Sequence, residues 1–184
     1  MPHLLELAST GRAKCRGCGR AIAKGELRFG EQIPNPFGEG EATLWFHPMC
    51  AAYKRPEAIL ERLAEGTPDA ADVAGLEQAA RASSAQRRLP RIDGAERAPS
   101  GQAKCRHCKQ KIEKGSWRIK LVFFEEGRFS PGGFIHLDCR KDYFEGHEVL
   151  APVLHFSPDL SDDEKAELSR VVGPTRVTLP SRSP

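Results

Sequence analysis

The sequence "AKCRGC" at residues 13–18 recurs, with one substitution, as "AKCRHC" at residues 103–108. After 28 residues the first copy is followed by His47-Pro-Met-Cys50, and after 27 residues the second is followed by His136-Leu-Asp-Cys139. The chain has six cysteines, and this scheme uses all of them. The 184-residue sequence is therefore read as two copies of one unit.

The cysteine and histidine spacing predicts a metal site in each copy. Two thiolates two residues apart can face one ion from a tight turn, and a distant His-x-x-Cys pair can complete a tetrahedron. The predicted zinc ligands are Cys15, Cys18, His47 and Cys50 in the first copy and Cys105, Cys108, His136 and Cys139 in the second. Four protein ligands leave no open position for water, so both zinc ions are expected to be structural. The alternative, a thioredoxin-like redox pair, needs neither the His-x-x-Cys nor a second copy.

Positive charge is concentrated around the two Cys-x-x-Cys turns. Residues 11–30 hold six basic residues against one acidic, and residues 101–120 hold seven against one, whereas the whole chain has a net charge of only +3. A polyanion is the natural partner for such patches. A solvated lysine-rich loop is the alternative for either patch alone, but its repetition favours binding.

The sequence also suggests where the protein works. The N-terminus "MPHLLELAST" lacks the basic and apolar regions of a secretory signal, and no apolar run approaches the length of a membrane span. The cysteines are therefore expected in a reducing compartment, where metal binding is commoner than disulfides. An intracellular location follows, and if the polyanion is DNA, this means the nucleoid or the nucleus.

The remaining pattern predicts an α+β fold of two small zinc-stabilised domains, each a short antiparallel sheet with C-terminal helices. In each copy a Lys-Gly turn leads into a strand with alternating apolar residues, and the arginine of that strand, Arg28 or Arg118, is expected to point outward. Helical patterns occupy residues 56–66 and 71–88, and another begins after Ser161. The expected domains are residues 1–89 and 101–175, with a linker and lead-in at 90–100 and a loose tail at 176–184.

Several motifs together resemble a known family. "ELASTGRAKCRGCGRAIAKGELRFG" at residues 6–30 and "LWFHPMC" at residues 44–50 are similar to the N-terminal zinc fingers of poly(ADP-ribose) polymerases and to the nick-sensing finger of a DNA ligase. The shared features are a Thr-Gly-Arg-Ala lead-in, the Cys-x-x-Cys, an Ile-x-Lys-Gly-x-Leu-Arg strand and a Trp-aromatic-His-x-x-Cys close. The resemblance covers most of residues 1–89 and, more loosely, residues 92–174.

This resemblance implies recognition of DNA breaks. In that family, arginines grip the sugar-phosphate backbone and an apolar loop caps exposed base pairs. Arg12 and Arg28 carry over in the first copy; in the second, Arg118 matches but Gln102 replaces the lead-in arginine. The capping residue is expected to be Phe37, with Phe124 or Phe129 as its counterpart. The basic residues of the two turns, Lys14, Arg16, Lys104 and Arg106, complete the set of expected DNA contacts.

The leading hypothesis is a sequence-independent DNA-binding protein that recognises nicks, ends or distorted duplex and has no catalytic activity of its own. The chain shows no phosphate-binding glycine loop and no nucleophile triad. One alternative is the DNA-targeting subunit of a separate repair enzyme. Another is a zinc-supported scaffold for protein or RNA, with the acidic helices as its contact surface.

Overall fold

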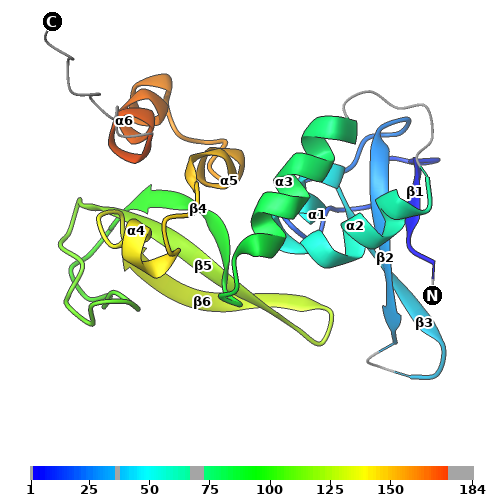
Figure 1. Ribbon diagram of the computed structural model, residues 1–184, viewed down its shortest axis with the longest axis horizontal. Coiled ribbons are helices and arrows are strands. Elements are labelled where there is room, and N and C mark those ends of the chain that lie inside the picture. The colour runs from blue at the N-terminus through cyan, green and yellow to red at the C-terminus, as the bar shows by residue number, and fades with distance from the viewer. Residues whose placement is uncertain (1, 36–37, 67–72, 174–184) are drawn as a thin grey trace, which may run out of the picture.

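Two three-stranded sheets lie side by side, and each belongs to one copy of the repeat (Figure 1). The computed structural model describes residues 2–35, 38–66 and 73–173. The first sheet contains β1 (Leu4–Leu7), β2 (Leu27–Pro34) and β3 (Glu41–Phe46); the second contains β4 (Arg91–Arg97), β5 (Trp117–Glu125) and β6 (Arg128–His136). Every neighbouring pair is antiparallel. The predicted α+β fold with two zinc-type units is therefore confirmed.

Three helices follow each sheet. They are α1 (Pro48–Lys54), α2 (Pro56–Ala64) and α3 (Val73–Ala85) in the first unit, and α4 (Arg140–Tyr143), α5 (Leu150–His155) and α6 (Asp162–Val172) in the second. The segments predicted as helical contain α2, α3 and α6, and Ser161 and Glu164 form a capping box at the start of α6. The short helices α1, α4 and α5 were not predicted, because four to seven residues give too little helical period to recognise.

The segment expected to be a linker and lead-in contains a strand. Residues 91–97 form β4 and pair with the middle strand β5, as β1 pairs with β2 in the first unit. The Asp93-Gly94 pair forms an irregularity inside β4, where the pairing register shifts between Ile92 and Ala95. Gly94 has φ +96°, a backbone conformation that few other residues adopt.

Each unit has its own hydrophobic core next to its cysteine and histidine cluster. Phe29, Phe46 and Ile59 are fully buried in the first core, and Ile112, Ile119 and Ile135 are fully buried in the second. The first core also includes Phe156 from the second half of the chain. The two units are therefore packed against each other.

None of the helices in residues 2–35, 38–66 and 73–173 is long and apolar enough to cross a membrane.

Candidate metal centres and nucleic-acid interface

Local structure brings the eight predicted metal ligands into two clusters. In the first unit, Cys15 and Cys18 lie on a turn, His47 follows β3 directly, and Cys50 lies in α1. The second unit repeats this arrangement with a histidine at the end of β6 and a cysteine just before α4. Within each cluster the possible ligand atoms all lie within 4.8 Å of one another.

The spacing of these atoms matches tetrahedral zinc. The Nδ1 atom of His47 lies 3.4 Å from Cys18 Sγ and 3.9 Å from Cys50 Sγ. The corresponding distances from His136 are 3.3 Å and 3.8 Å. Zinc bonds of ordinary length at a tetrahedral angle separate sulfur and nitrogen by about 3.6 Å. Both Cys3His sites thus fit structural zinc ions, as predicted.

Contacts outside the ligand set fix the orientation of each histidine. His47 Nε2 lies 3.3 Å from the Ala21 carbonyl oxygen, and His136 Nε2 lies 3.1 Å from that of Lys111. A proton on Nε2 satisfies each carbonyl and leaves Nδ1 with its lone pair toward the cysteines. The backbone amide of His47 also donates to Cys15 Sγ at 3.3 Å. The protein thus preorganises both the imidazole and one thiolate for metal binding.

The thiols of each cluster also shift one another's pKa values. Hydrogen bonding with Cys15 lowers the pKa of Cys18, whereas hydrogen bonding with Cys15 raises the pKa of Cys50. In the second cluster, burial followed by hydrogen bonding with Cys108 raises the pKa of Cys139 to about 12. Neighbouring thiols compete for ionisation because thiolates repel one another. Three thiolates in one site are stable only around a cation such as Zn²⁺.

Comparison with known proteins identifies the first unit. Residues 6–86 match the poly(ADP-ribose) polymerase and DNA-ligase zinc-finger region. This first unit belongs to that zinc-finger family. The match begins within β1 and ends just after α3, so it includes strands β2 and β3, all four zinc ligands and helices α1, α2 and α3.

Relatives extend the similarity into the second finger. A poly(ADP-ribose) polymerase of Drosophila melanogaster is 28% identical over 96% of this chain, and one of Sarcophaga peregrina is 31% identical over 76%. Poly(ADP-ribose) polymerase 1 of Gallus gallus is 30% identical over 75% of the chain. The aligned part is 15–20% of the length of these relatives.

Beside the first zinc site lies an open cleft that contains three of the predicted DNA contacts. Its volume is about 540 Å³. Arg12, Lys14 and Arg16 line it together with Thr43 and Trp45. The three basic side chains are exposed, and none forms an ion pair in the described part of the chain. None of the described residues that line the cleft is acidic. The cleft therefore combines a basic surface with a partly exposed indole.

The structure corrects the expected orientation of the strand arginines. Arg28 is 9% exposed and Arg118 is 6% exposed, so neither projects into solvent. Arg28 Nη2 donates to Glu6 at 2.6 Å, and its guanidinium lies 3.6 Å from the centre of the Trp45 ring. Because β2 is a central strand, neighbours on β1 and β3 enclose its polar face as well as its apolar one. Gly30 leaves the space in which the Trp45 ring crosses β2, since a Cβ there would meet the ring at 2.7 Å.

The second finger contains the same arrangement of a glutamate, an arginine and an aromatic ring. This arrangement was not predicted from the sequence. Arg118 Nη2 donates to Glu96 at 2.5 Å, and its guanidinium lies 3.6 Å from the centre of the Phe134 ring. Glu6 and Glu96 each face their arginine across the first strand pair. The signal that could have found them is the repeat itself, because Glu96 follows Glu6 at the same spacing at which Cys105 follows Cys15.

The phenylalanines predicted to cap broken DNA are only partly described. Phe37 lies outside the described residues. Phe124 and Phe129 are half-buried and pack against the core of the first finger. The Phe129 ring contacts that of Phe46 edge-on, with ring centres 6.3 Å apart. The counterpart of the expected capping loop in the second finger is therefore engaged within the molecule.

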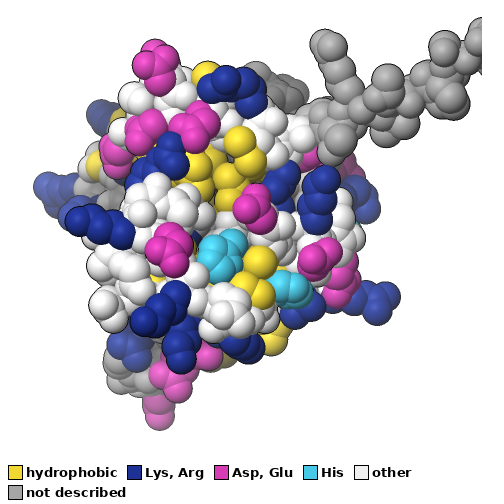
Figure 2. All heavy atoms as spheres, turned by 90° about the vertical axis from the view of Figure 1, so that its left-hand side faces the viewer, with side chains coloured by type: hydrophobic (Ala, Val, Ile, Leu, Met, Phe, Trp, Pro, Cys, Tyr) yellow, Lys and Arg dark blue, Asp and Glu magenta, His cyan; other side chains and the backbone are white. Residues whose placement is uncertain are grey.

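The second finger presents its charges differently from the first. Lys104 and Arg106 are exposed, and the Arg106 guanidinium lies 4.8 Å from the centre of the Phe123 ring. His107 stands where the first finger has Gly17; it is exposed and is not one of the clustered ligands. Figure 2 looks onto the end of the molecule formed by the second finger and shows basic and acidic side chains interspersed. This face is thus less uniformly basic than the cleft of the first finger.

Proposed function

We propose that this chain binds duplex DNA without sequence specificity, at nicks, ends or distortions, and that the first zinc finger supplies the main contact. The observation that carries the proposal is the cleft lined by Arg12, Lys14 and Arg16, whose cations have no acidic partner in the described chain. The zinc-finger family to which residues 6–86 belong takes its name from poly(ADP-ribose) polymerases and DNA ligases, and the second of these enzymes is named for acting on DNA.

Phosphate binding follows from the chemistry of this cleft. Exposed Arg and Lys side chains gain binding energy by releasing the counterions of the DNA backbone, which requires no contact with bases. Thr43 offers a hydroxyl group on the same wall, and Trp45 offers an apolar edge. In this proposal Arg12, Lys14 and Arg16 contact phosphates, and Arg28 supports the Trp45 ring beside them.

Selectivity for breaks requires an apolar contact that intact duplex cannot make. A nick or end exposes the face of a base pair, and stacking on such a face is worth about 1–3 kcal/mol. We assign this role to Phe37, which follows β2 in the chain. We do not assign base-pair stacking to Phe124 or Phe129, because both pack against the core of the first finger.

In the second finger, we propose weaker phosphate contacts by Lys104 and Arg106, with Arg118 held inside the sheet as Arg28 is. The described residues are assigned no catalytic step, so any enzymatic activity at the break is assigned to a repair enzyme that acts with this chain. Binding to chromosomal DNA would place it in the nucleoid or the nucleus.

Competition binding tests the proposal. The full chain is titrated against labelled nicked duplex at two salt concentrations, with intact closed-circular, nicked, blunt-ended and overhanging DNA as competitors. We expect tighter binding to nicked or broken DNA and a steep loss of affinity at the higher salt. Equal affinity for closed and nicked circles would refute break recognition while leaving DNA binding intact. An absence of binding to every DNA would refute the proposal and favour the protein or RNA scaffold.

A further inference from the structure

The two zinc fingers are joined by an interface that no sequence pattern predicted. The second finger contacts the first through three segments: the tip of the β5–β6 hairpin, the irregularity in β4 and the end of α5 (Figure 1). On the first finger these segments meet sheet β1–β3 and helix α1. Each contact involves a residue that is buried or ligates the first metal site.

The tip of the hairpin is shaped to lie on the first sheet. Glu126 and Gly127 have φ values of +49° and +76°, which indicates a tight two-residue turn between β5 and β6. A Cβ on Gly127 would lie 2.9 Å from Ile33 Cδ1 of β2, so any other residue would displace the end of the Ile33 side chain and would also adopt a strained positive φ. Next to the turn, the Phe124 ring lies 3.8 Å from the Arg55 guanidinium of the first finger.

A buried lysine of the first finger depends on the second finger for its counter-charge. The side chain of Lys54, in α1, is 1% exposed. Its Nζ donates to the Gly17 carbonyl oxygen at 2.5 Å, within the first Cys-x-x-Cys turn, and also to the carboxylate of Asp93 in β4. The ring of Phe156 lies 4.1 Å from the same nitrogen. A buried ammonium without a counter-ion is strongly unfavourable, so the Asp93 contact stabilises the docked arrangement.

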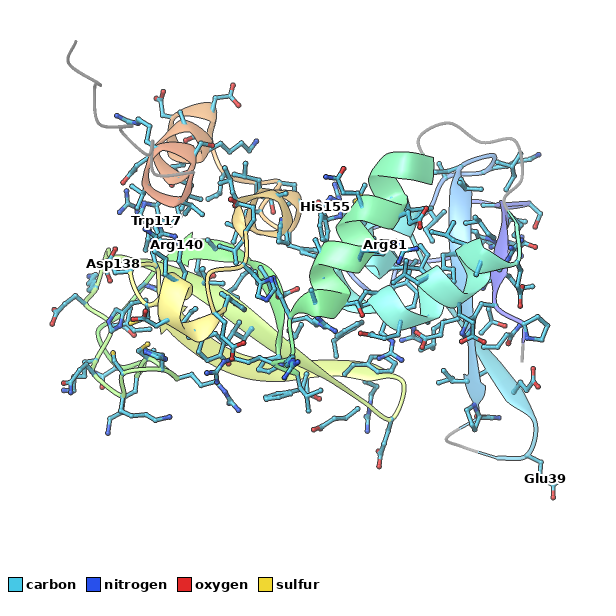
Figure 3. The ribbon with its side chains drawn as sticks, viewed as in Figure 1. Glu39, Arg81, Trp117, Asp138, Arg140 and His155 are labelled. Atoms are coloured by element: carbon cyan, nitrogen blue, oxygen red, sulfur yellow. The ribbon has the colours of Figure 1, made fainter. Side chains whose placement is uncertain are left out.

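The third contact reaches the first metal site directly. His155, at the end of α5, lies between α5 and α3 (Figure 3). Its Nε2 is 3.1 Å from Sγ of Cys50, which is fully buried. A metal-bound thiolate can only accept, so the imidazole donates. The Tyr53 ring packs edge-on against His155, with ring centres 5.2 Å apart. Among the described residues, the matching ligand Cys139 has no donor from outside its own cluster.

We propose that the second zinc finger is an intramolecular partner that completes the first zinc site, with His155 as a positioning residue for the Cys50 thiolate. Asp93 holds the two fingers together by pairing with Lys54, and the hairpin aligns them. Contacts from the second finger thus determine how tightly the first finger holds its zinc ion. The inference rests on contacts within the chain and does not depend on DNA binding.

Zinc transfer to an excess of a chromophoric chelator tests this arrangement on the full chain. Partners that orient a metal ligand typically contribute 10–100-fold to metal affinity. We expect His155→Ala to weaken binding of one of the two zinc ions by about tenfold or more and to leave the other unchanged. His155→Gln places an amide donor near the position of Nε2 and should restore most of the affinity. The matched control is His147→Ala, which changes a histidine of the same finger that no described contact links to a metal ligand.

Tryptophan fluorescence identifies the site that changes. Trp45 and Trp117 lie in different fingers, so Trp117→Phe leaves a reporter in the first finger and Trp45→Phe leaves one in the second. The zinc ion that is bound more weakly should be lost at the same chelator concentration at which the Trp45 fluorescence changes. Unchanged zinc affinity in His155→Ala, an equal loss from both sites, or a loss that follows Trp117 would each overturn the proposal.

The ion pair provides a second test that does not involve a metal ligand. Asp93→Ala removes the counter-charge of Lys54, and Asp93→Asn keeps an acceptor without the charge. We expect Asp93→Ala to shift the unfolding equilibrium reported by Trp45 by roughly ten- to a hundredfold, although the substitution lies in the second finger, with a smaller shift for Asp93→Asn. A Trp45 transition unaffected by Asp93→Ala would show that the fingers fold independently and would refute the coupling.

Discussion

Replacing Arg12 by alanine should weaken DNA binding by an amount that depends on salt in a calculable way. In the part of the chain that the structure describes, Arg12 is one of three cations in the first-finger cleft that have no acidic partner. Each phosphate contact contributes about 0.9 to the slope of log K against log salt. Loss of one contact therefore reduces affinity roughly eightfold at 0.1 M salt but only about threefold at 0.3 M. Fluorescence anisotropy with nicked duplex at four or five salt concentrations measures both the affinity and the slope.

A matched charge change controls for the net charge of the protein. Arg81 lies on α3, its side chain is 69% exposed, and it pairs with Glu77 (Figure 3). Arg81→Ala removes the same charge at a distance from the cleft and should change neither the slope nor the affinity at high salt. If Arg12→Ala leaves the slope unchanged, or if Arg81→Ala lowers it equally, the phosphate contact does not lie in the cleft and the reasoning fails.

Three further predictions follow from the fold. Elemental analysis should find two zinc ions per chain, and a strong chelator should abolish the circular-dichroism signal of the folded state, since structural zinc contributes on the order of 10 kcal/mol. Gly127→Ala should destabilise the protein by about 1–2 kcal/mol in denaturant titrations, because it combines a positive φ with the close approach to Ile33. A hydrogen bond from Trp117 lowers the pKa of Glu167 below its ordinary value near 4.5, so this carboxylate stabilises the fold above that pH and less as the pH falls through the lowered pKa. The stability difference between the wild type and Glu167→Gln, measured by Trp117 fluorescence, should therefore be present at pH 7 and shrink under acid conditions.

The metal sites could be predicted from the sequence because their ligands carry the information locally. A Cys-x-x-Cys turn and a His-x-x-Cys at a strand end place their donor atoms through short segments whose geometry varies little. The strand of each finger that follows the Lys-Gly turn was predictable for the same reason, since Gly25 and Gly115 adopt the positive φ that such turns need. Repetition in the chain then doubled the evidence for each feature.

The first strand of each sheet was harder to predict. β1 has only four residues, and β4 contains Asp93-Gly94, which is typical of a turn. β4 is a strand because it completes the edge of β5, and its irregular residues are accommodated by the Phe156 carbonyl and the Ser157 hydroxyl. Its conformation thus depends on α5, some sixty residues later in the chain, which no local pattern can reveal.

The strand arginines show how a correct motif can be given a wrong orientation. Alternation along β2 correctly put Arg28 on the face opposite Phe29, but it does not reveal whether a second layer covers that face. Glu6 and Trp45 cover it, so Arg28 is enclosed by its own sheet. The exposed cations Arg12, Lys14 and Arg16 are then the ones free to reach a phosphate, and Arg28 supports the indole beside them.

The contact between the two fingers affects how much each finger can contribute to binding at a DNA break. Two independent fingers on a flexible linker would gain avidity by reaching two positions on the DNA. Here the hairpin that carries Phe124 and Phe129 is committed to the first finger, and Asp93 and His155 hold Lys54 and Cys50 in place. The second finger therefore stabilises the first instead of offering an equal second grip, so Arg12→Ala should cost more DNA affinity than Lys104→Ala even though both remove one exposed cation next to a zinc site.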